Sequence, residues 1–430
     1  MTRREALAAP FVQAAAARRP NFLVILTDQQ THNAWSGSGN GWLKTPAMDS
    51  IARRGTVFTN AVCPYPVCSP SRSSIFTGRM PHETAVMGNG GPIPAGMASL
   101  GELFRAAGYN TAYGGKWHLP KSFDGMTGFT KIIGGSALGR DMDAPLSNAC
   151  SDWLRRSPGG PFLLVASFMN PHDICDWIRQ HKGTRELPAA AVMPPAPLNM
   201  AVDPEEPEAI QYHRTAGYDL MSQAVGIASE WRRDDMRHYH HDYYRMVEQV
   251  DAEIGKVLAA LRETGQERDT VIVFASDHGE GLGAHRWAQK ASFYEESLRV
   301  PLFVAGPGVA TGVNGELATL ADIVPTLCAL AGIPAPADVR GVNICGGFKR
   351  DFVASELRYG DPGREGRMIR TRHHKYVRFN SGARAEQLFD LDADPGETFN
   401  LARRGGTLLQ AHRQLMNDWL SKTGDSFARL

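Results

Sequence analysis

Residues 22–29 read Phe-Leu-Val-Ile-Leu-Thr-Asp-Gln, a continuous apolar run that ends in polar residues. Two later segments have the same form. Phe-Leu-Leu-Val-Ala at 162–166 leads toward Asn-Pro-His at 170–172, and Val-Ile-Val-Phe at 271–274 leads into Ser-Asp-His at 276–278. Strands that are apolar throughout are typical of parallel sheets covered on both faces. Ligand sites in such sheets collect at the carboxyl ends of strands, so we expect these three polar clusters to share one site.

Helical periodicity separates these strands, and the alternation of strands with helices predicts a doubly wound α/β fold. The expected architecture is a large, mixed, mostly parallel sheet between layers of helices. Between residues 180 and 233 the pattern gives way to Pro-rich and polar sequence, which we interpret as an irregular wall of a binding pocket. The predicted helices cover residues 48–54, 100–107, 234–264 and 322–331.

The character of the chain changes after Gly346-Gly347. Short alternating segments at 368–371 and 376–379, with turn residues between runs, predict a small antiparallel sheet. A helix over residues 408–420 is expected to close it. The predicted organisation is a tail or export signal at 1–19, a main α/β domain at 20–345 and a small C-terminal subdomain at 346–430.

The composition excludes several classes of protein. The 46 Lys and Arg residues nearly balance the 45 Asp and Glu residues, so the net charge of +1 favours neither nucleic acid nor a polybasic membrane contact. No apolar run approaches the roughly 20 residues of a membrane-spanning helix. The six cysteines form no Cys-x-x-Cys pair, and in a chain of 430 residues they do not indicate a disulfide scaffold.

The N-terminus resembles a short export signal. Arg3-Arg4 precede an Ala-rich stretch that ends at Ala15-Ala16-Ala17, which is typical of a twin-arginine leader with a small-residue cleavage site. The alternative is a frayed tail. We expect export to the periplasm or secretion.

The densest cluster of functional residues is Cys-Ser-Pro-Ser-Arg-Ser-Ser-Ile-Phe-Thr-Gly-Arg at 68–79. Pro70 suits the first turn of a helix and Ser69 suits a cap, so Cys68 is expected beside a helix N-terminus. Free backbone N–H groups favour an anion there and would lower the pKa of a thiol. An ordinary thiol nucleophile is therefore one interpretation of Cys68.

This stretch is similar to the sulfatase family, whose motif is Cys-x-Pro-Ser-Arg followed by Thr-Gly-Arg. The resemblance extends from Pro20 to about Leu401 and implies an alkaline-phosphatase-like fold with a type I sulfatase activity. It implies that a formylglycine-generating maturation enzyme oxidises Cys68 to an aldehyde. Once hydrated, the aldehyde offers one hydroxyl that attacks sulfur and a second whose deprotonation releases sulfate.

Further elements resemble the segments that hold sulfate in this family. Gly-Lys-Trp-His at 115–118 and Asn-Pro-His at 170–172 are two of them, and the stretch 289–301 is the third. Sulfuryl transfer spreads negative charge over oxygens that need fixed positive partners. The resemblance implies that the catalytic residues are Cys68, Arg72, Lys116, His118, His172 and Lys290.

Two strand ends supply hard carboxylate ligands for a divalent metal. The expected ligand set is Asp28, Gln29, Cys68, Asp277 and His278. Many family members carry a second Asp where this chain has Gln29, and some carry Asn at the position of His278. Ca²⁺ is the expected ion, with Mn²⁺ or Mg²⁺ as alternatives because imidazole is a poor calcium ligand.

Three functions remain open at this point. The first is hydrolysis of a sulfated small molecule or oligosaccharide. The second is a phosphonate monoester or phosphodiester hydrolase on the same fold, which also uses formylglycine. The third is a non-catalytic glycan-binding relative, and it predicts missing catalytic residues, whereas all six are present in the sequence.

Overall fold

A computed structural model describes residues 19–91, 93–94, 96–119, 128–135, 138–156, 159–181, 192–360 and 363–427. The N-terminal segment interpreted as an export signal lies almost entirely outside the described residues. Among the described residues, no helix has the length and apolar character needed to cross a membrane.

In the described part of the chain, eight strands form the central sheet in the order β4-β3-β5-β1-β6-β7-β2-β8. Strand β1 lies between β5 and β6 and pairs in parallel with both. Of the strand pairs among these eight described strands, only β6–β7 and β7–β2 are antiparallel, because β7 runs against its neighbours. The mixed, mostly parallel sheet is therefore confirmed. The strands are β1 (Asn21–Asp28), β2 (Gly55–Val62), β3 (Asn110–Gly115), β4 (Thr130–Gly134), β5 (Phe162–Pro171), β6 (Thr270–Ser276), β7 (Leu302–Ala305) and β8 (Gly312–Thr319).

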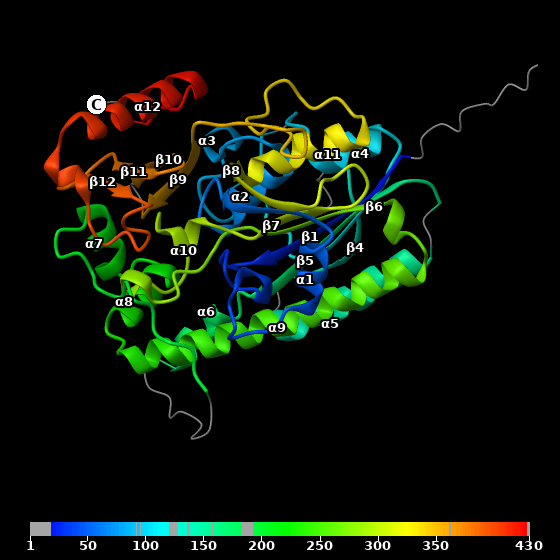
Figure 1. The fold of residues 1–430 in the computed structure, drawn as a ribbon, viewed down its shortest axis with the longest axis horizontal. Coiled ribbons are helices and arrows are strands. Elements are labelled where there is room, and N and C mark those ends of the chain that lie inside the picture. Colours follow the sequence, from blue (N-terminus) through cyan, green and yellow to red (C-terminus); the bar gives the residue numbers. More distant parts are fainter. Residues whose placement is uncertain are drawn as a thin grey trace, which may run out of the picture.

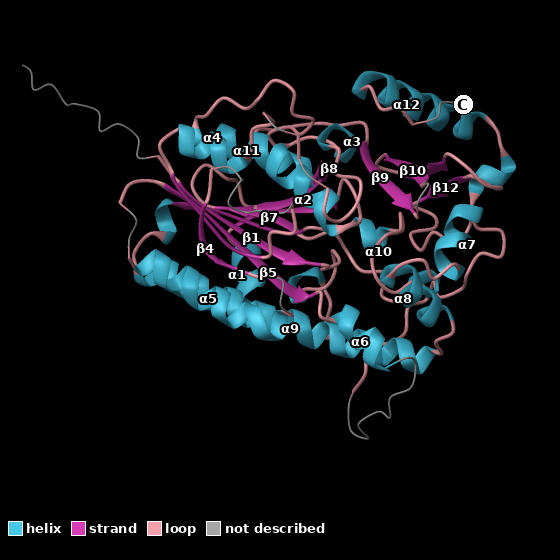
Figure 2. Ribbon diagram, turned by 180° about the vertical axis from the view of Figure 1, so that it is seen from behind, coloured by secondary structure: helices cyan, strands magenta, loops and turns pink. Residues whose placement is uncertain are grey.

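Helices cover both faces of this sheet (Figure 1). Helices α5 and α9 run along one face, while α2, α4 and α11 lie on the other, and the reverse view shows the same layers (Figure 2). Helices that accompany this sheet are α1 (Pro46–Ala52), α2 (Cys68–Thr77), α4 (Leu100–Ala106), α5 (Gly139–Arg155), α6 (Ile174–His181), α9 (Arg233–Glu263) and α11 (Ile323–Ala331). The four helices predicted from periodicity are all present, within one or two residues of the expected ends.

The alternation of side chains along β1 divides the core in two. Phe22, Val24 and Leu26 pack into one buried cluster together with α2, α4 and α11. Leu23 and Ile25 pack into a second cluster with α1, α5 and α9. Successive strand residues point to opposite faces, so both faces of β1 are buried and its sequence is continuously apolar.

A second, antiparallel sheet, with four strands in the described residues, follows the main one, as the alternating segments predicted. Helix α12 (Thr407–Thr423) packs on it, and both lie at one end of the molecule in Figures 1 and 2. The strands are β9 (Val353–Tyr359), β10 (Arg364–Arg370), β11 (His374–Phe379) and β12 (Glu386–Asp390). A division of the chain between residues 345 and 346 stays a prediction.

The segment 180–233 is more regular than its sequence predicts. It contains two short helices, α7 (Glu208–Thr215) and α8 (Leu220–Ser229). The Asp219 side chain accepts a hydrogen bond from the N–H of Ser222 and so caps α8, which is a local signal that the surrounding Pro-rich sequence obscures. Residues 182–191 lie outside the described part of the chain.

An ion-pair cluster joins the segment after α2 to the small antiparallel sheet. His82 lies on α3 (Pro81–Thr84), just after α2, and its Nδ1 is 2.6 Å from Glu356 of β9 and 3.7 Å from Asp425 near the C-terminus. Burial alone would lower the pKa of His82, but Glu356 and Asp425 outweigh it and raise the pKa above its usual value. Protonated His82 therefore stabilises the folded chain.

We expect His82→Gln to destabilise the protein most at acidic pH. Because the folded pKa is raised above the unfolded value of 6.5, the contribution of His82 is fully present below that pH. It is lost as the pH rises through the folded pKa. Urea unfolding of both proteins across this range would measure the stability difference, and a difference that grows with pH would contradict the assignment.

Candidate active site

The three polar clusters meet at one edge of the central sheet, as predicted. Asp28 ends β1 and lies in register with Pro171 at the end of β5. On the other side of β1, Thr27 is in register with Ser276, directly before Asp277. Parallel neighbours end at the same edge, so residues about 140 and 250 positions apart converge here.

Cys68 is the first residue of helix α2, which points its N-terminus at these strand ends. Ser69 is not the cap, contrary to our expectation. Val67 occupies that position without a side-chain cap, and the Ser69 hydroxyl instead bonds the carbonyl of His118. The N–H of Ser69 donates to Asn89 Oδ1 at 3.1 Å. The helix start is therefore held by tertiary contacts rather than by a local capping motif.

Arg72 lies one turn further along α2 and is completely buried. Its Nε is 2.7 Å from Asp277 Oδ2, and one of its terminal nitrogens is 2.9 Å from Asp28 Oδ2. A guanidinium group can bind two carboxylates at once because its donors form a rigid, planar fork. Its other side-chain hydrogen bonds go to the carbonyl of Lys116 and the hydroxyl of Ser167, so the Arg72 guanidinium positions the two carboxylates.

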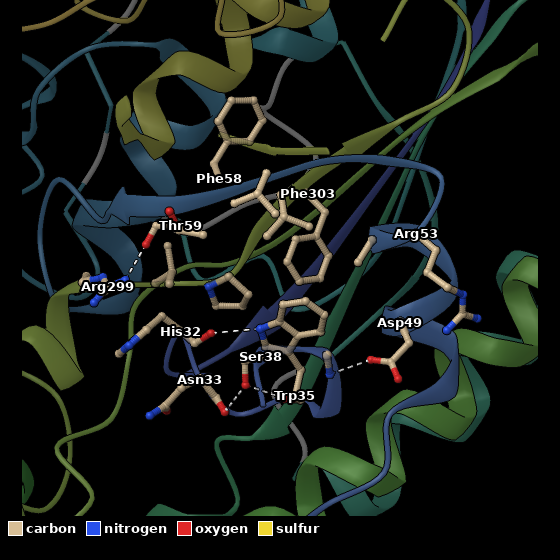
Figure 3. Close-up of a pocket in the computed structure, with 16 residues that line it drawn as sticks. His32, Asn33, Trp35, Ser38, Asp49, Arg53, Phe58, Thr59, Arg299 and Phe303 are labelled. Carbon is tan, nitrogen blue, oxygen red and sulfur yellow. Dashed lines mark hydrogen bonds between the residues drawn. The ribbon is translucent and has the colours of Figure 1, made fainter. Parts of the chain in front are cut away.

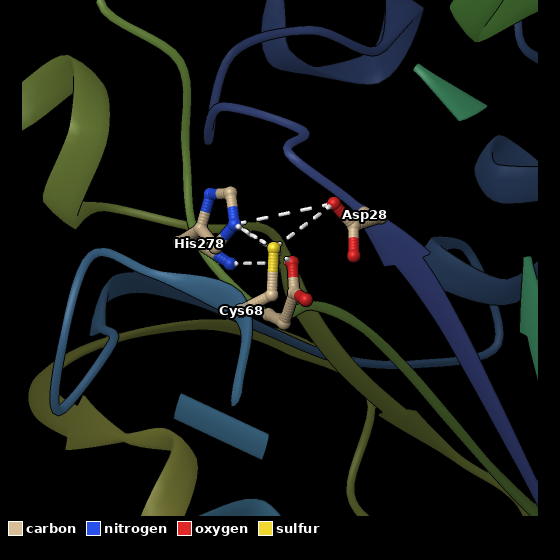
Figure 4. A group of neighbouring side chains, drawn as sticks. Asp28, Cys68 and His278 are labelled. Carbon is tan, nitrogen blue, oxygen red and sulfur yellow. Dashed lines mark hydrogen bonds and ion pairs between the residues drawn. The ribbon is translucent and has the colours of Figure 1, made fainter. Parts of the chain in front are cut away.

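Two lysines and one histidine surround the thiol of Cys68. Lys290 Nζ lies 3.0 Å from Sγ, His278 Nε2 lies 3.2 Å away and Lys116 Nζ lies 3.6 Å away. Asp28 Oδ1 is 3.7 Å from the same sulfur (Figure 4). All five residues are buried. A fixed set of cations around one buried atom is suited to binding an anion at that position.

These charges dominate the protonation of the thiol. Burial raises the pKa of Cys68, but the positive charges of Lys116, Lys290 and His278 outweigh burial and bring the pKa well below the usual value. Burial and the neighbouring Asp28 carboxylate raise the pKa of Asp277. Shifts of pKa that arise from burial and specific neighbouring charges are typical of functional sites.

His172 and His118 complete the predicted catalytic set at the edge of the site. His172 Nε2 lies 3.9 Å from Asp28 Oδ1, and its side chain is 22% exposed. Burial, followed by the charges of Lys116 and Lys290, lowers the pKa of His172 to about 4. His118 is exposed and lines the same cavity as His172 and Lys290. The structure thus brings all six predicted catalytic residues to one place.

Gln29 is held by contacts that the sequence did not reveal. Its amide nitrogen donates to Glu280 at 2.6 Å, and its amide oxygen accepts from Lys290 at 3.0 Å. Cys175 lies beside it and is 3.0 Å from Gln289 Oε1. Glu280, only two residues after His278, was the signal available in the sequence. Gln29 therefore orients Lys290, in addition to any ligand role.

The donor atoms fit a divalent cation. Asp28, Cys68, Asp277 and His278 each offer one ligand atom, and these atoms all lie within 4.8 Å of one another. Arg72 binds the Oδ2 atom of each aspartate, which leaves each Oδ1 on the side of Cys68 and His278. The hard carboxylate oxygens suit Ca²⁺, Mn²⁺ or Mg²⁺, whereas the imidazole of His278 is a poor ligand for Ca²⁺.

A cavity of about 580 Å³ adjoins the site and is lined by His118, His172 and Lys290. The start of α8 forms part of its wall, in agreement with the interpretation of that segment as a pocket wall. A second cavity of similar volume lies between α1, β2 and β7 and is lined by His32, Trp35 and Phe303 (Figure 3). Among the described residues, none lines both cavities, and no predicted site residue lines the second.

Comparison with known proteins agrees with this geometry. The Sulfatase family model matches residues 20–333, and a model of the C-terminal part of N-sulphoglucosamine sulphohydrolase matches residues 283–421. The chain belongs to the type I sulfatase family, on the alkaline-phosphatase-like fold. It is a sulfuric ester hydrolase.

Individual relatives are similar over nearly the whole chain. A Delta 4,5-hexuronate-2-O-sulfatase from Bacteroides thetaiotaomicron is 32% identical, over 97% of this chain and 92% of the relative. An ulvan-active sulfatase from Formosa agariphila is 30% identical, over 95% and 82%. The solved structure of a 2-O GAG sulfatase superimposes with a TM-score of 0.86 at 30% identity, covering 96% of this chain and 94% of the other.

Similarity to a phosphonate hydrolase is weaker. The crystal structure of a phosphonate monoester hydrolase from Agrobacterium radiobacter gives a TM-score of 0.77 at 22% identity, covering 95% of this chain and 96% of the other. At that identity the likeness concerns the fold.

Proposed function

We propose that the protein hydrolyses a sulfate ester of a saccharide, with formylglycine formed from Cys68 as the nucleophile. One observation carries the proposal: the residue at the conversion position is buried, faces Lys116 and Lys290, and lies between the carboxylates of two separate strands. The similarity to the hexuronate and ulvan sulfatases supports a sulfated saccharide as substrate.

In this proposal each group has a distinct part. As a hydrated aldehyde, residue 68 supplies a hydroxyl that attacks sulfur. Lys116 and Lys290 bind the sulfate oxygens and offset the charge that builds up on them. Arg72 and Gln29 hold the carboxylates and Lys290 in place, which lowers the reorganisation needed during the reaction.

His172 gives its proton to the leaving alcohol oxygen, and His118 assists release of sulfate. In the free site His172 is neutral near pH 7, because its pKa is about 4. The negative charge of a bound sulfate opposes the effect of the two lysines and favours the protonated ring.

The proposed metal ligands are Asp28 and Asp277 through Oδ1, His278 through Nε2, Gln29, and residue 68 in its converted form. When bound, a divalent cation there would polarise a sulfate oxygen as a Lewis acid. Calcium is the proposed ion, with manganese or magnesium as alternatives.

Removal of divalent cations with a chelator is expected to lower kcat/KM by at least about 100-fold. Addition of Ca²⁺ should restore the activity if calcium is the native ion, while Mn²⁺ or Mg²⁺ would restore it if the imidazole of His278 sets the preference. Elemental analysis of the chelated protein is the control. Full activity in protein free of divalent metal would contradict the ligand assignment.

Parallel assays on aryl sulfate and aryl phosphonate esters test the reaction class. The converted enzyme should hydrolyse the sulfate ester with the higher kcat/KM. A dominant rate on the phosphonate would reject the proposal in favour of a phosphonate hydrolase, and inactivity of a converted enzyme on every ester would favour a glycan-binding role.

Export is a separate part of the proposal. It rests on Arg3-Arg4 and the Ala-rich stretch that follows, which lie outside the described residues. Conversion of Cys68 requires a maturation enzyme in the same host, and we propose that it acts on the chain before folding buries the thiol.

A further inference from the structure

The cavity beside the active site contains two arginines to which the proposed reaction gives no part. Its volume of about 580 Å³ is within the range of about 300–1,000 Å³ that is common for ligand pockets. His118, His172 and Lys290 line it next to residue 68, and Arg179 and Arg358 line it as well. A substrate whose sulfate reaches Lys290 therefore shares this cavity with both guanidinium groups.

Arg179 lies on α6, one helical turn beyond Cys175. Its Nε donates to the carbonyl of Cys175 at 3.3 Å, and the Cys175 thiol contacts Gln289 next to Lys290. Four residues of helix advance by about 6 Å, a distance comparable to the width of a sugar ring. Arg179 is exposed, so its charge faces the cavity and solvent rather than a buried partner.

Arg358 reaches the cavity from the small sheet. On β9 its neighbours Leu357 and Tyr359 are buried, whereas Arg358 is exposed. A Cβ placed on Gly88 would lie 4.0 Å from a terminal nitrogen of Arg358. The next residue, Asn89, bonds the backbone of Ser69, so the Arg358 guanidinium lies close to the start of α2.

Neither guanidinium has its charge neutralised within the part of the chain that the structure describes. Arg179 and Arg358 form no ion pair with any described carboxylate. The Asp219 carboxylate also lines the cavity, but it accepts a hydrogen bond from Ser222 at 2.7 Å as the cap of α8. Glu365, the cross-strand neighbour of Arg358, bonds Arg367 instead.

We propose that Arg179 and Arg358 form a subsite for a second anionic group of the substrate, separate from the sulfate that is cleaved. This inference rests on the proposed function and deepens it, because it restricts the substrate to a doubly anionic saccharide. The fork of donors on a guanidinium matches the oxygens of a carboxylate or a second sulfate. Two guanidinium groups from different elements would select for a negatively charged sugar and would also hold it in one orientation.

Steady-state kinetics on matched sugars test this subsite. The substrates are a hexose monosulfate, the hexuronic acid sulfated at the same position, and the hexose disulfate that adds a second sulfate. The wild-type enzyme should prefer one of the two doubly anionic sugars over the hexose monosulfate by about 10- to 100-fold in kcat/KM. The preferred sugar identifies the second anion as carboxylate or sulfate.

Arg179→Ala and Arg358→Ala should each remove most of this preference by raising the KM for the doubly anionic sugar. The kcat/KM on an aryl sulfate that lacks a second anion should change little. Arg→Lys at either position should restore part of it, because charge is kept while the fork of donors is lost. Arg268→Ala is the matched control, since the Arg268 side chain is 84% exposed and lines neither cavity.

Equal kcat/KM of the wild-type enzyme on all three sugars would overturn the subsite while leaving the proposed function intact, provided that aryl sulfate is still cleaved. Equal losses of kcat/KM on aryl sulfate and on the doubly anionic sugar in both variants would also overturn the subsite, because they would indicate damage to the active site. No turnover of any sulfate ester by converted protein would overturn the proposed function and the subsite together.

Discussion

Replacement of Cys68 by alanine is expected to lower sulfate ester hydrolysis by at least about 10⁴-fold. The methyl side chain offers no nucleophile, and the neighbouring lysines would bind sulfate without a group to attack it. Because Cys68 is fully buried beside Lys290 and His278, the variant also removes the atom around which these charges gather. The measurement is kcat/KM on aryl sulfate with protein from a host that performs the conversion.

Cys345→Ala is the matched control for this variant. Cys345 is a free, partly exposed cysteine on the loop after α11, and it lines neither cavity described here. It should keep full activity. Retention of more than a small fraction of activity in Cys68→Ala would show that another residue attacks sulfur.

Replacement of Arg72 by alanine is expected to cost about 3–5 kcal/mol of stability, the loss typical when one partner of a buried ion pair is removed. Arg72 and both of its partners, Asp28 and Asp277, are fully buried. Its loss leaves two carboxylates close together without their shared cation. Urea unfolding in the presence of a chelator measures the effect, because a divalent ion would otherwise neutralise part of the charge on the two buried carboxylates.

Arg72→Lys separates charge from geometry. Lysine keeps the positive charge but cannot bond both carboxylates with a rigid fork, so we expect a smaller loss of stability and a clear loss of activity. Arg79→Ala is a useful comparison, because Arg79 pairs with Asp338, which is 67% exposed. This variant should therefore lose far less stability than Arg72→Ala. A loss below about 1 kcal/mol for Arg72→Ala would contradict the structural role assigned to this residue.

The sequence was most informative about elements that are specified by a local or repeating pattern of residues. Continuous apolar runs identified the three central strands, because burial on both faces leaves no polar position along them. The small antiparallel sheet could be recognised from its alternation. The order of strands could not, since nothing in β7 itself indicates that it lies between β6 and β2 and runs against both.

The candidate site was predicted in outline, and its supporting contacts were not. The motif at Cys68 led to a helix N-terminus, but the expected Ser69 cap was wrong because Ser69 bonds a distant carbonyl. Likewise, Gln29 is held by Glu280 and Lys290, which only the folded chain brings together. Arg179 and Arg358 belong to no recognisable sequence motif. Their proposed role follows only from the cavity that both of them line.

The central claim is that residue 68 acts as an aldehyde rather than as a thiol. Mass spectrometry of the peptide that spans residue 68, from active protein made in a converting host, tests this claim most directly. We predict a peptide lighter than the encoded sequence by the change of a CH₂SH group to CHO. An unmodified cysteine at this position in fully active protein would contradict it.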